Sequence, residues 1–231
     1  MSLNDPLISI IIPTYQRKKL LNKTIKSILK QTYKNFEIIV IDNFSDYNFF
    51  DFMNSFNDER IIPCQNQNDG IIAKNRNFGI KKSKGNWVAF CDDDDIWLPF
   101  KLENQLKKIK NSDSIMTFSM HKHFGNVSIL SNNFGIGPLP FRKDVTKFGL
   151  LNSNCIPTST VIVKKSIFGH IGYFDERKIF IGIEDNDLWI RVSEIGKISF
   201  VPKVLVLHRN HERNTLSKTK TIFEARLELF K

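Results

Sequence analysis

The sequence lacks the features that mark secreted, membrane-spanning and zinc-binding proteins. Its cysteines, Cys64, Cys91 and Cys155, are odd in number, widely spaced and without a Cys-x-x-Cys pair, which argues against a disulfide framework and a cysteine-based zinc site. No apolar run approaches the roughly eighteen residues of a transmembrane helix. The amino terminus has no basic region of the kind that opens a secretory signal peptide. We therefore expect a cytoplasmic protein.

Acidic residues are scarce relative to basic ones. The chain has 34 Lys and Arg against 24 Asp and Glu, for a net charge of +10. Such an excess favours anionic partners, namely nucleotide phosphates, an acidic membrane surface or nucleic acid. No arginine-rich arm, zinc finger or aromatic RNA-binding signature accompanies the lysines, so we expect no nucleic-acid partner. Peripheral contact with a membrane stays open.

Apolar runs and helical spacing alternate along the first half of the chain. The runs predict strands at residues 7–12, 36–41, 60–64 and 87–91, and segments of helical spacing lie between and after them. In the second half, strands are predicted at 158–163 and 198–207, and a helix opens at residues 183–192. The alternation predicts a parallel sheet wound with helices, in which ligands bind beyond the carboxyl ends of the strands.

Four consecutive carboxylates, Asp92 to Asp95, follow the apolar run Trp87–Cys91. Like charges at the end of a buried strand repel one another and resist desolvation. A hard divalent cation would remove that difficulty, and strand alternation would place Asp92 and Asp94 on one face to hold it. The alternative is a solvated acidic loop in which Asp95 caps the next helix. Polar pairs also follow the first two strands, and the three clusters are expected to converge.

Several motifs, in this order, resemble those of family 2 glycosyltransferases. The opening residues 13–17, 27–33 and 36–45 resemble the start of that family. Asn75–Ile80 is similar to its A-R-N-x-G-I run, residues 92–103 to its D-x-D-D-x-W-x-P-x-K-L-E segment, and residues 184–191 to its E-D-x-D-L-x-x-R helix. The match extends over residues from about 7 to 216.

The resemblance implies an α/β protein of the GT-A fold, with a Rossmann-like, mostly parallel sheet flanked by helices. Residues 1–120 would form the half that binds the nucleotide sugar, and residues 121–231 a smaller acceptor-binding half of the same compact domain. The implied reaction transfers a sugar with inversion from a nucleotide sugar, most of all a UDP-sugar, to a saccharide or lipid-linked acceptor in cell-surface polysaccharide synthesis. The implied cofactor is Mn²⁺ or Mg²⁺.

The resemblance also implies roles for individual residues. The donor would contact Thr14, Tyr15, Asp42, Asn43, Arg76, Asp92 and Asp93. The metal would be held by Asp94, with Asp92 and His208 as further ligands. Asp185 would be the catalytic base, and Glu184 would orient the acceptor or cap the helix. The family pattern has a second Asp where this chain has Asn43, whose amide can both accept and donate at a uracil.

Alternatives to these roles stay open. Asp42 could form an Asx-turn, Asp185 could cap its helix, and Arg209 rather than His208 could contact the pyrophosphate. His121 and His123 are expected to be unrelated to the site. The alternative functions are a sugar-phosphate nucleotidylyltransferase and a nucleic-acid-binding module. The first class carries a glycine-rich phosphate loop near its first strand, whereas residues 13–17 contain no glycine.

Overall fold

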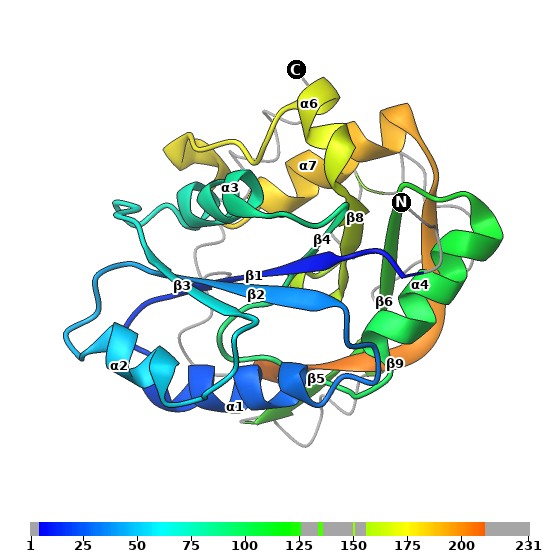
Figure 1. The fold of residues 1–231 in the computed structure, drawn as a ribbon. Helices are drawn as coiled ribbons and strands as arrows, with labels where there is room; N and C mark the ends of the chain where they lie inside the picture. Colours follow the sequence, from blue (N-terminus) through cyan, green and yellow to red (C-terminus); the bar gives the residue numbers. More distant parts are fainter. Residues whose placement is uncertain (1–4, 126–133, 136–149, 151–155, 211–231) are drawn as a thin grey trace.

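The computed structural model describes residues 5–125, 134–135, 150 and 156–210. The helices and strands of this part follow one another as predicted for a wound α/β sheet (Figure 1). The strands are β1 (Ile8–Thr14), β2 (Phe36–Asp42), β3 (Ile61–Gln65), β4 (Trp87–Phe90), β5 (Ile96–Trp97), β6 (Met116–Gly125), β7 (Phe134–Gly135), β8 (Ile162–Lys164) and β9 (Ile198–Asn210). The helices are α1 (Lys18–Leu29), α2 (Phe49–Asn54), α3 (Ile72–Lys82), α4 (Lys101–Ser112), α6 (Phe168–Ile171) and α7 (Glu184–Ile195), with 3-10 turns η2 (Thr158–Thr160), η3 (Lys165–Ile167) and η4 (Lys178–Phe180).

The strands form one sheet in the order β3-β2-β1-β4-β8-β6-β9-β5, with β7 paired to β6. The pairs β3–β2, β2–β1 and β1–β4 are parallel, whereas β8 pairs antiparallel with both β4 and β6. Helices α1 and α2 lie on one side of the parallel part, and α3 and α7 on the other (Figure 1). This is the predicted α/β architecture.

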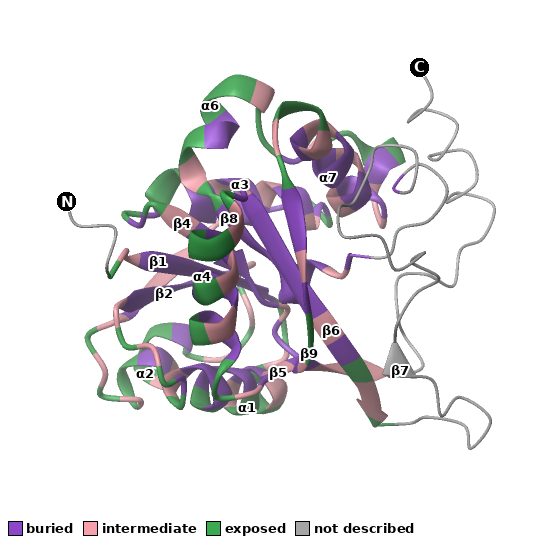
Figure 2. Ribbon diagram, turned by 90° about the vertical axis from the view of Figure 1, so that its right-hand side faces the viewer, coloured by how far each residue is buried: buried purple, intermediate pink, exposed green. Residues whose placement is uncertain are grey.

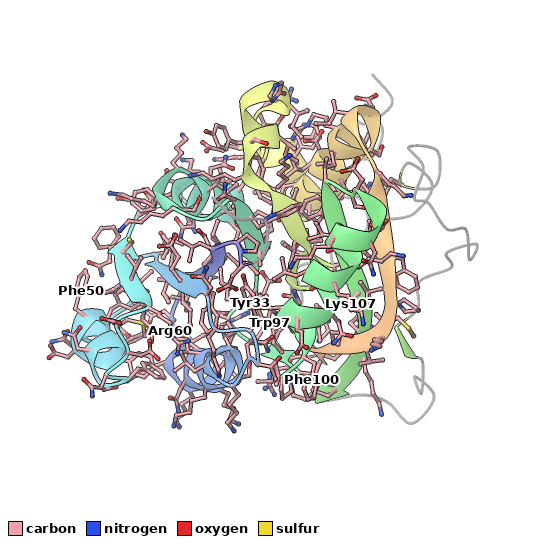
Figure 3. The ribbon with its side chains drawn as sticks, turned by 45° about the vertical axis from the view of Figure 1, so that its right-hand side comes forward. Tyr33, Phe50, Arg60, Trp97, Phe100 and Lys107 are labelled. Atoms are coloured by element: carbon pink, nitrogen blue, oxygen red, sulfur yellow. The ribbon has the colours of Figure 1, made fainter. Side chains whose placement is uncertain are left out.

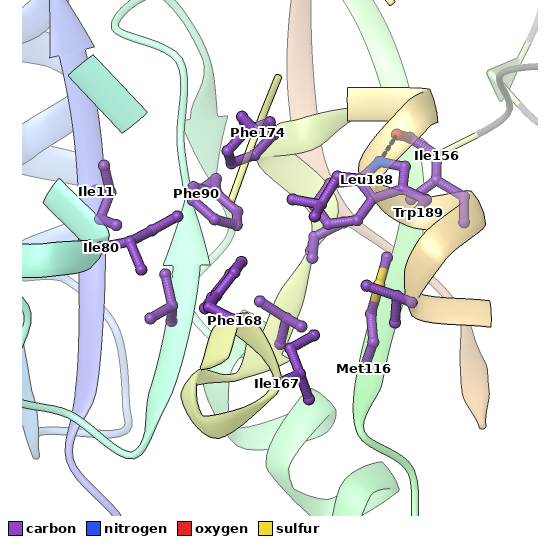
Figure 4. Packing of buried hydrophobic residues seen from close by; sticks show 14 of the residues in the cluster. Ile11, Ile80, Phe90, Met116, Ile156, Ile167, Phe168, Phe174, Leu188 and Trp189 are labelled. Carbon is purple, nitrogen blue, oxygen red and sulfur yellow. Dashed lines mark hydrogen bonds between the residues drawn. The ribbon is translucent and has the colours of Figure 1, made fainter. Parts of the chain in front are cut away.

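The sheet separates two hydrophobic clusters, which explains why β1 and β2 carry apolar residues on both faces. Their buried polar residues Ser9 and Glu37 pair with each other, the Ser9 hydroxyl donating to Glu37 at 2.6 Å. In β1, Ile10 and Ile12 join the cluster with Ile25 and Trp97, whereas Ile11 points to the opposite face. On that opposite face, Ile11, Ile80, Phe90, Leu188 and Trp189 belong to one cluster (Figure 4). The strands are buried from both sides, as the burial colours show (Figure 2).

Residues 158–163 differ from the strand that their β-branched composition predicts. Thr158–Thr160 form the 3-10 turn η2, and the strand β8 begins only at Ile162. The Thr160 hydroxyl donates to the carbonyl of Pro157 at 2.7 Å, and the Thr160 amide donates to the same oxygen at 2.9 Å. Such local side-chain bonds compete with strand pairing.

In the described part of the chain, no helix is both long and apolar enough to cross a membrane. Residues 131–157 are rich in Asn, Gly and Pro, a composition that predicts a long loop, and residues 222–230 have the apolar spacing of an amphipathic segment. These two segments lie largely or wholly outside the described residues.

Candidate functional site

The site forms where β1, β2 and β4 end. Thr14 is the last residue of β1 and lies opposite Asp42, the last residue of β2. Its hydroxyl donates to Oδ2 of Asp93 at 2.7 Å, in the acidic run that follows β4. The amide of Asn43 donates to the carbonyl of Thr14 at 3.0 Å. The three polar clusters predicted at the strand ends therefore lie together.

Arginines neutralise much of the acidic run, which removes the repulsion expected among four carboxylates. Nη1 of Arg17 lies 3.0 Å from Oδ1 of Asp93 and 2.7 Å from Oδ2 of Asp94. Nη2 of Arg76 lies 2.9 Å from Oδ1 of Asp92. Arg17 has no role in the sequence-based assignment, although it is the last residue of the opening motif at residues 13–17, and that position could have indicated one. A diphosphate entering the site would meet both cations.

Asp93 is buried, and that burial governs its acidity. Desolvation of the carboxylate raises the pKa of Asp93 to about 6, although the charge of Arg17 and the hydrogen bond from Thr14 oppose the shift. The same two contacts fix the carboxylate against β1. Asp93 therefore joins the ends of β1 and β4.

The loop after β2 is organised by its own side chains. Asp42 accepts hydrogen bonds from the Ser45 amide at 2.9 Å and the Ser45 hydroxyl at 2.5 Å, as the predicted Asx-turn alternative requires. Oδ1 of Asn43 accepts from the amide of Asn68 at 2.9 Å. Phe44 follows at a left-handed φ of 58° with its side chain exposed. A left-handed conformation is uncommon for a bulky residue, so the surrounding hydrogen bonds of this loop hold Phe44 in it.

Tyr15 lies in the loop after β1 and is about half exposed, at 53%. The backbone of the next residue, Gln16, donates from its amide to the Ser45 hydroxyl at 2.8 Å, which ties this loop to the loop after β2. The two exposed aromatic residues, Tyr15 and Phe44, therefore lie on loops that are held together. A planar base could stack on such side chains.

Glu184 and Asp185 open helix α7, but their surroundings differ. Oε1 of Glu184 accepts from Nη1 of Arg76 at 2.6 Å, and Oε2 accepts from the Gly182 amide at 2.7 Å. Oδ2 of Asp185 accepts from the Thr158 hydroxyl at 2.9 Å, and Oδ1 from the Asn186 amide at 2.8 Å. Glu184 is thus bound to Arg76, whereas Asp185 is held by η2 and its own helix.

The acidity of Asp185 suits a proton acceptor. Burial, and next the negative charge of Glu184, raise the pKa of Asp185 to about 6, while Arg76 and the Thr158 hydroxyl act in the opposite direction. A base is most effective when its pKa lies near the working pH. The carboxylate is therefore ionised at neutral pH and basic enough to take a proton.

Arg76 joins these two parts of the site. It is buried, with 3% of its surface exposed, and its guanidinium donates to both Asp92 and Glu184. The contact brings the start of α7 to the acidic run, although 108 residues separate Arg76 from Glu184 in the chain.

The carboxylates fit a divalent ion that shares its ligands with a substrate. Among the described residues, no group of three or more His, Cys, Asp or Glu side chains is arranged to hold a metal by itself. Mg²⁺ is usually bound by one or two carboxylates together with substrate phosphates, rather than by an all-protein cage. The oxygen donors of Asp92 and Asp94 agree with that mode.

His208 lies in β9 beside Asp95. Its Nδ1 is 3.3 Å from Oδ2 of Asp95, and this carboxylate raises the pKa of His208 to about 9 against the effect of burial. Its ring also packs against His121 and His123, with ring centroids 5.8 Å and 5.3 Å away. Sequence spacing did not predict this cluster, because β6 and β9 are paired only in the folded sheet.

Arg209, the residue after His208, also contacts the acidic run. Its amide donates to Oδ1 of Asp95 at 2.9 Å, and its Nε donates to the carbonyl of Asp94 at 2.9 Å. The end of β9 therefore borders the site.

Comparison with known proteins decides the family. A model described as glycosyl transferase family 2 matches residues 9–172. The chain belongs to glycosyltransferase family 2. A curated member from Escherichia coli, UDP-Glc:alpha-D-GlcNAc-diphosphoundecaprenol beta-1,3-glucosyltransferase WfgD, is 32% identical over 200 residues, which cover 86% of this chain and 74% of WfgD.

Two solved structures support the GT-A fold of this family 2 glycosyltransferase. S. aureus TarS 1-349 in complex with UDP-GlcNAc superposes with a TM-score of 0.75 at 22% identity, over 91% of this chain and 60% of that one. Mannosyltransferase PcManGT from Pyrobaculum calidifontis, in complex with GDP-Man and Mn²⁺, gives 0.71 at 16% identity, over 90% and 58%. The chain thus spans about three fifths of each of these two structures.

Proposed function

We propose that this family 2 glycosyltransferase transfers a sugar with inversion from a UDP-sugar to a lipid-linked saccharide in polysaccharide synthesis. The observation that carries the proposal is the double contact of Arg76 with Asp92 and Glu184, because Glu184 directly precedes the proposed base, Asp185, and the same arginine contacts the acidic run. WfgD supports the substrate classes, since its name specifies UDP-Glc and a GlcNAc-diphosphoundecaprenol acceptor. The complex of TarS with UDP-GlcNAc agrees with a UDP-sugar donor.

The donor would bind at the strand ends. Thr14, Tyr15, Asp42 and Asn43 would receive the base and ribose, and Arg76, Asp92 and Asp93 the phosphates and the sugar. The exposed Tyr15 and the neighbouring loops support this placement. Residues 1–120 would then form the donor half and residues 121–231 the acceptor half. A peripheral position at a membrane would give access to a lipid-linked acceptor, and the positive net charge of +10 favours it.

Mn²⁺ or Mg²⁺ would be held by Asp94, with Asp92 as a further ligand, and would supply positive charge to the departing diphosphate. His208 would join them as a ligand only on losing the proton that its ion pair with Asp95 favours. The chain itself offers Arg17 for the same charge, since its guanidinium already lies at Asp93 and Asp94. The Arg17 guanidinium would be in place before the reaction begins, and such preorganised charge stabilises a leaving anion.

Asp185 would act as the base. The acceptor hydroxyl oxygen forms a bond to C1 of the donor sugar, and the bond from C1 to the diphosphate oxygen breaks on the opposite face. The electron pair leaves with the nucleoside diphosphate, and the hydroxyl proton passes to the Asp185 carboxylate. Attack opposite the leaving group inverts the anomeric centre. Glu184 would hold Arg76 and the start of α7 in place.

The alternative functions find less support. A nucleotidylyltransferase and a nucleic-acid-binding module are both outside the family that the chain matches. A direct test incubates the protein with UDP-glucose, UDP-GlcNAc or GDP-mannose, a synthetic GlcNAc-diphosphate lipid and Mn²⁺, and measures nucleotide release together with the product by mass spectrometry. We expect UDP release that requires the acceptor. Release from none of the donors, with binding of nucleic acid that weakens steeply with salt, would contradict the proposal.

A further inference from the structure

The turn η2 contacts both the acidic run, at Asp92, and the proposed base, Asp185. None of its residues has a role in the function proposed above. Its three residues, Thr158, Ser159 and Thr160, all carry hydroxyl groups and are all buried. It connects Pro157 to the strand β8, in the middle of the sheet. A buried polar turn in such a place needs partners for its side chains and its backbone.

The turn is fixed to the acidic run through Ser159. Oγ of Ser159 accepts from the amide of Asp92 at 3.0 Å, and its carbonyl accepts from the indole Nε1 of Trp97 at 3.1 Å. Trp97, labelled in Figure 3, is a residue of β5 and is buried in the hydrophobic cluster that also contains Leu102 and Leu106 of α4. The backbone of η2 therefore has a fixed position relative to Asp92.

A second attachment comes from helix α4. Nε2 of Gln105, which is fully buried, donates to the carbonyl of Thr160 at 2.9 Å. With the Ser159 contacts, this leaves η2 little freedom to move. A hydroxyl carried by the turn is consequently held at a defined point.

Thr158, in this rigid turn, contacts the proposed base, Asp185. Its hydroxyl donates to Oδ2 of Asp185 at 2.9 Å, and the Asn186 amide donates to Oδ1 at 2.8 Å. Each carboxylate oxygen is thus anchored by a separate donor, so the plane of the carboxylate is set from both sides. A carboxylate oxygen can accept more than one hydrogen bond, which permits an acceptor hydroxyl to approach as well.

We infer that Thr158 is a positioning residue for the base, orienting the Asp185 carboxylate toward the acceptor hydroxyl from a turn that is itself fixed to Asp92. The inference rests on the proposed function, in which Asp185 takes the proton. It differs from a purely structural role, because the Thr158 hydroxyl also stabilises the ionised form of the carboxylate. In the described part of the chain, Glu184 and Arg76 are charged groups that act on Asp185, and neither changes when Thr158 is replaced.

The test compares Thr158→Val with Thr160→Val. Both replacements remove one hydroxyl from a buried residue of the same turn and keep the shape of the side chain. The Thr160 hydroxyl, however, donates to the carbonyl of Pro157 rather than to Asp185. Thr158→Ser is the third variant, since it retains a hydroxyl. The measurements are kcat across pH with saturating UDP-sugar, the Kd for UDP and the melting temperature.

We expect Thr158→Val to move the midpoint of the acidic limb of kcat upward by about one pH unit, because the carboxylate loses a donor. On the alkaline plateau, where Asp185 is ionised in every variant, we expect a loss of about ten-fold from poorer orientation. The Kd for UDP should stay unchanged. Thr160→Val should keep the wild-type midpoint, and Thr158→Ser should restore most of the activity.

An acidic limb and a plateau in Thr158→Val equal to those of Thr160→Val would overturn the inference. If Thr158→Val does not fold, Thr158→Ala takes its place with the same expected results, since the smaller side chain also lacks the hydroxyl. Carboxyl ¹³C NMR titration, with the Asp185 signal assigned by its loss in Asp185→Asn, tests the contact without any activity. If the pKa of Asp185 rises in Thr158→Val but the wild-type protein transfers no sugar, the contact is real and the proposed function is refuted. If the pKa of Asp185 does not change, the inference is refuted.

Discussion

Nη1 of Arg76 donates to Oε1 of Glu184 at 2.6 Å, in a contact that is buried on both sides. Nη2 of the same guanidinium donates to Asp92. The single cation therefore connects helix α3, the acidic run after β4 and the start of α7. This connection makes one site from segments that lie far apart in the sequence.

Removal of the Arg76 charge should destabilise the fold. In Arg76→Met, the buried carboxylate of Glu184 loses its cation and Asp92 loses a partner, which costs roughly 3–5 kcal/mol when a buried pair is broken from one side. Urea unfolding at pH 7 measures the loss. Lys74→Met, in the same helix, is the control, because Lys74 pairs with the exposed Asp69. The prediction is wrong if the two variants unfold at the same urea concentration.

Asp94 should control metal-dependent nucleotide binding. In the wild-type protein we expect EDTA to raise the Kd for UDP. In Asp94→Asn we expect EDTA to change nothing, since the amide lacks the negative charge with which a carboxylate binds Mn²⁺. Isothermal titration with and without Mn²⁺ gives both values. Asp113→Asn is the control: Asp113 ends α4 in a left-handed conformation that Asn accommodates. An unchanged response to Mn²⁺ in Asp94→Asn would remove Asp94 from the metal site.

Asn43→Asp should alter the discrimination between bases. In the wild-type protein, Oδ1 of Asn43 accepts a hydrogen bond from the Asn68 amide, and one oxygen of the new carboxylate can keep this bond. The other oxygen, an acceptor, takes the place of the Asn43 side-chain NH₂, a donor. Uracil carries an N3–H donor and cytosine an N3 acceptor, so affinity for UDP relative to CDP should rise by about 3- to 10-fold, the worth of one hydrogen bond. Competition binding gives the ratio. The same ratio in both proteins would mean that this position does not contact the base.

The pH dependence of transfer should follow Asp185. Since burial raises the pKa of Asp185 to about 6, the carboxylate is protonated below that value and cannot accept the hydroxyl proton. Above pH 7 the rate should be independent of this group, and below pH 5 it should fall about ten-fold per pH unit. A kcat profile measured at saturating donor and acceptor checks this. A rate that stays constant down to pH 4.5 would exclude Asp185 as the base.

The sequence predicted the sheet and the convergence of its strand ends because these depend on local patterns. Mostly apolar, β-branched runs such as Ile8–Ile12 and the acidic residues after Phe90 indicate buried parallel strands and a polar edge. The motifs of the family gave the remaining assignments, including those of Arg76 and Asp185. Whether these residues act as assigned stays a prediction.

Other parts of the site could not be predicted, because they depend on long-range contacts. Thr158 reaches Asp185 across 27 residues, and a hydroxyl residue in a β-branched segment carries no sign of such a partner. His121 and His123 were expected to be unrelated to the site, yet the pairing of β6 with β9 brings them to His208. Arg17 contacts Asp94 across 77 residues. In each case the sheet determines which side chains meet.

The most direct test of the account is the turnover of Asp185→Asn with a UDP-sugar and a lipid-linked GlcNAc acceptor, measured beside Glu184→Gln and the Kd of each for UDP. We predict that Asp185→Asn loses about 10²- to 10⁴-fold in kcat, the usual effect of removing a general base, while its affinity for UDP stays close to that of the wild type. Glu184→Gln should lose less, because Glu184 acts through Arg76. Near-normal turnover in Asp185→Asn would contradict the proposed mechanism.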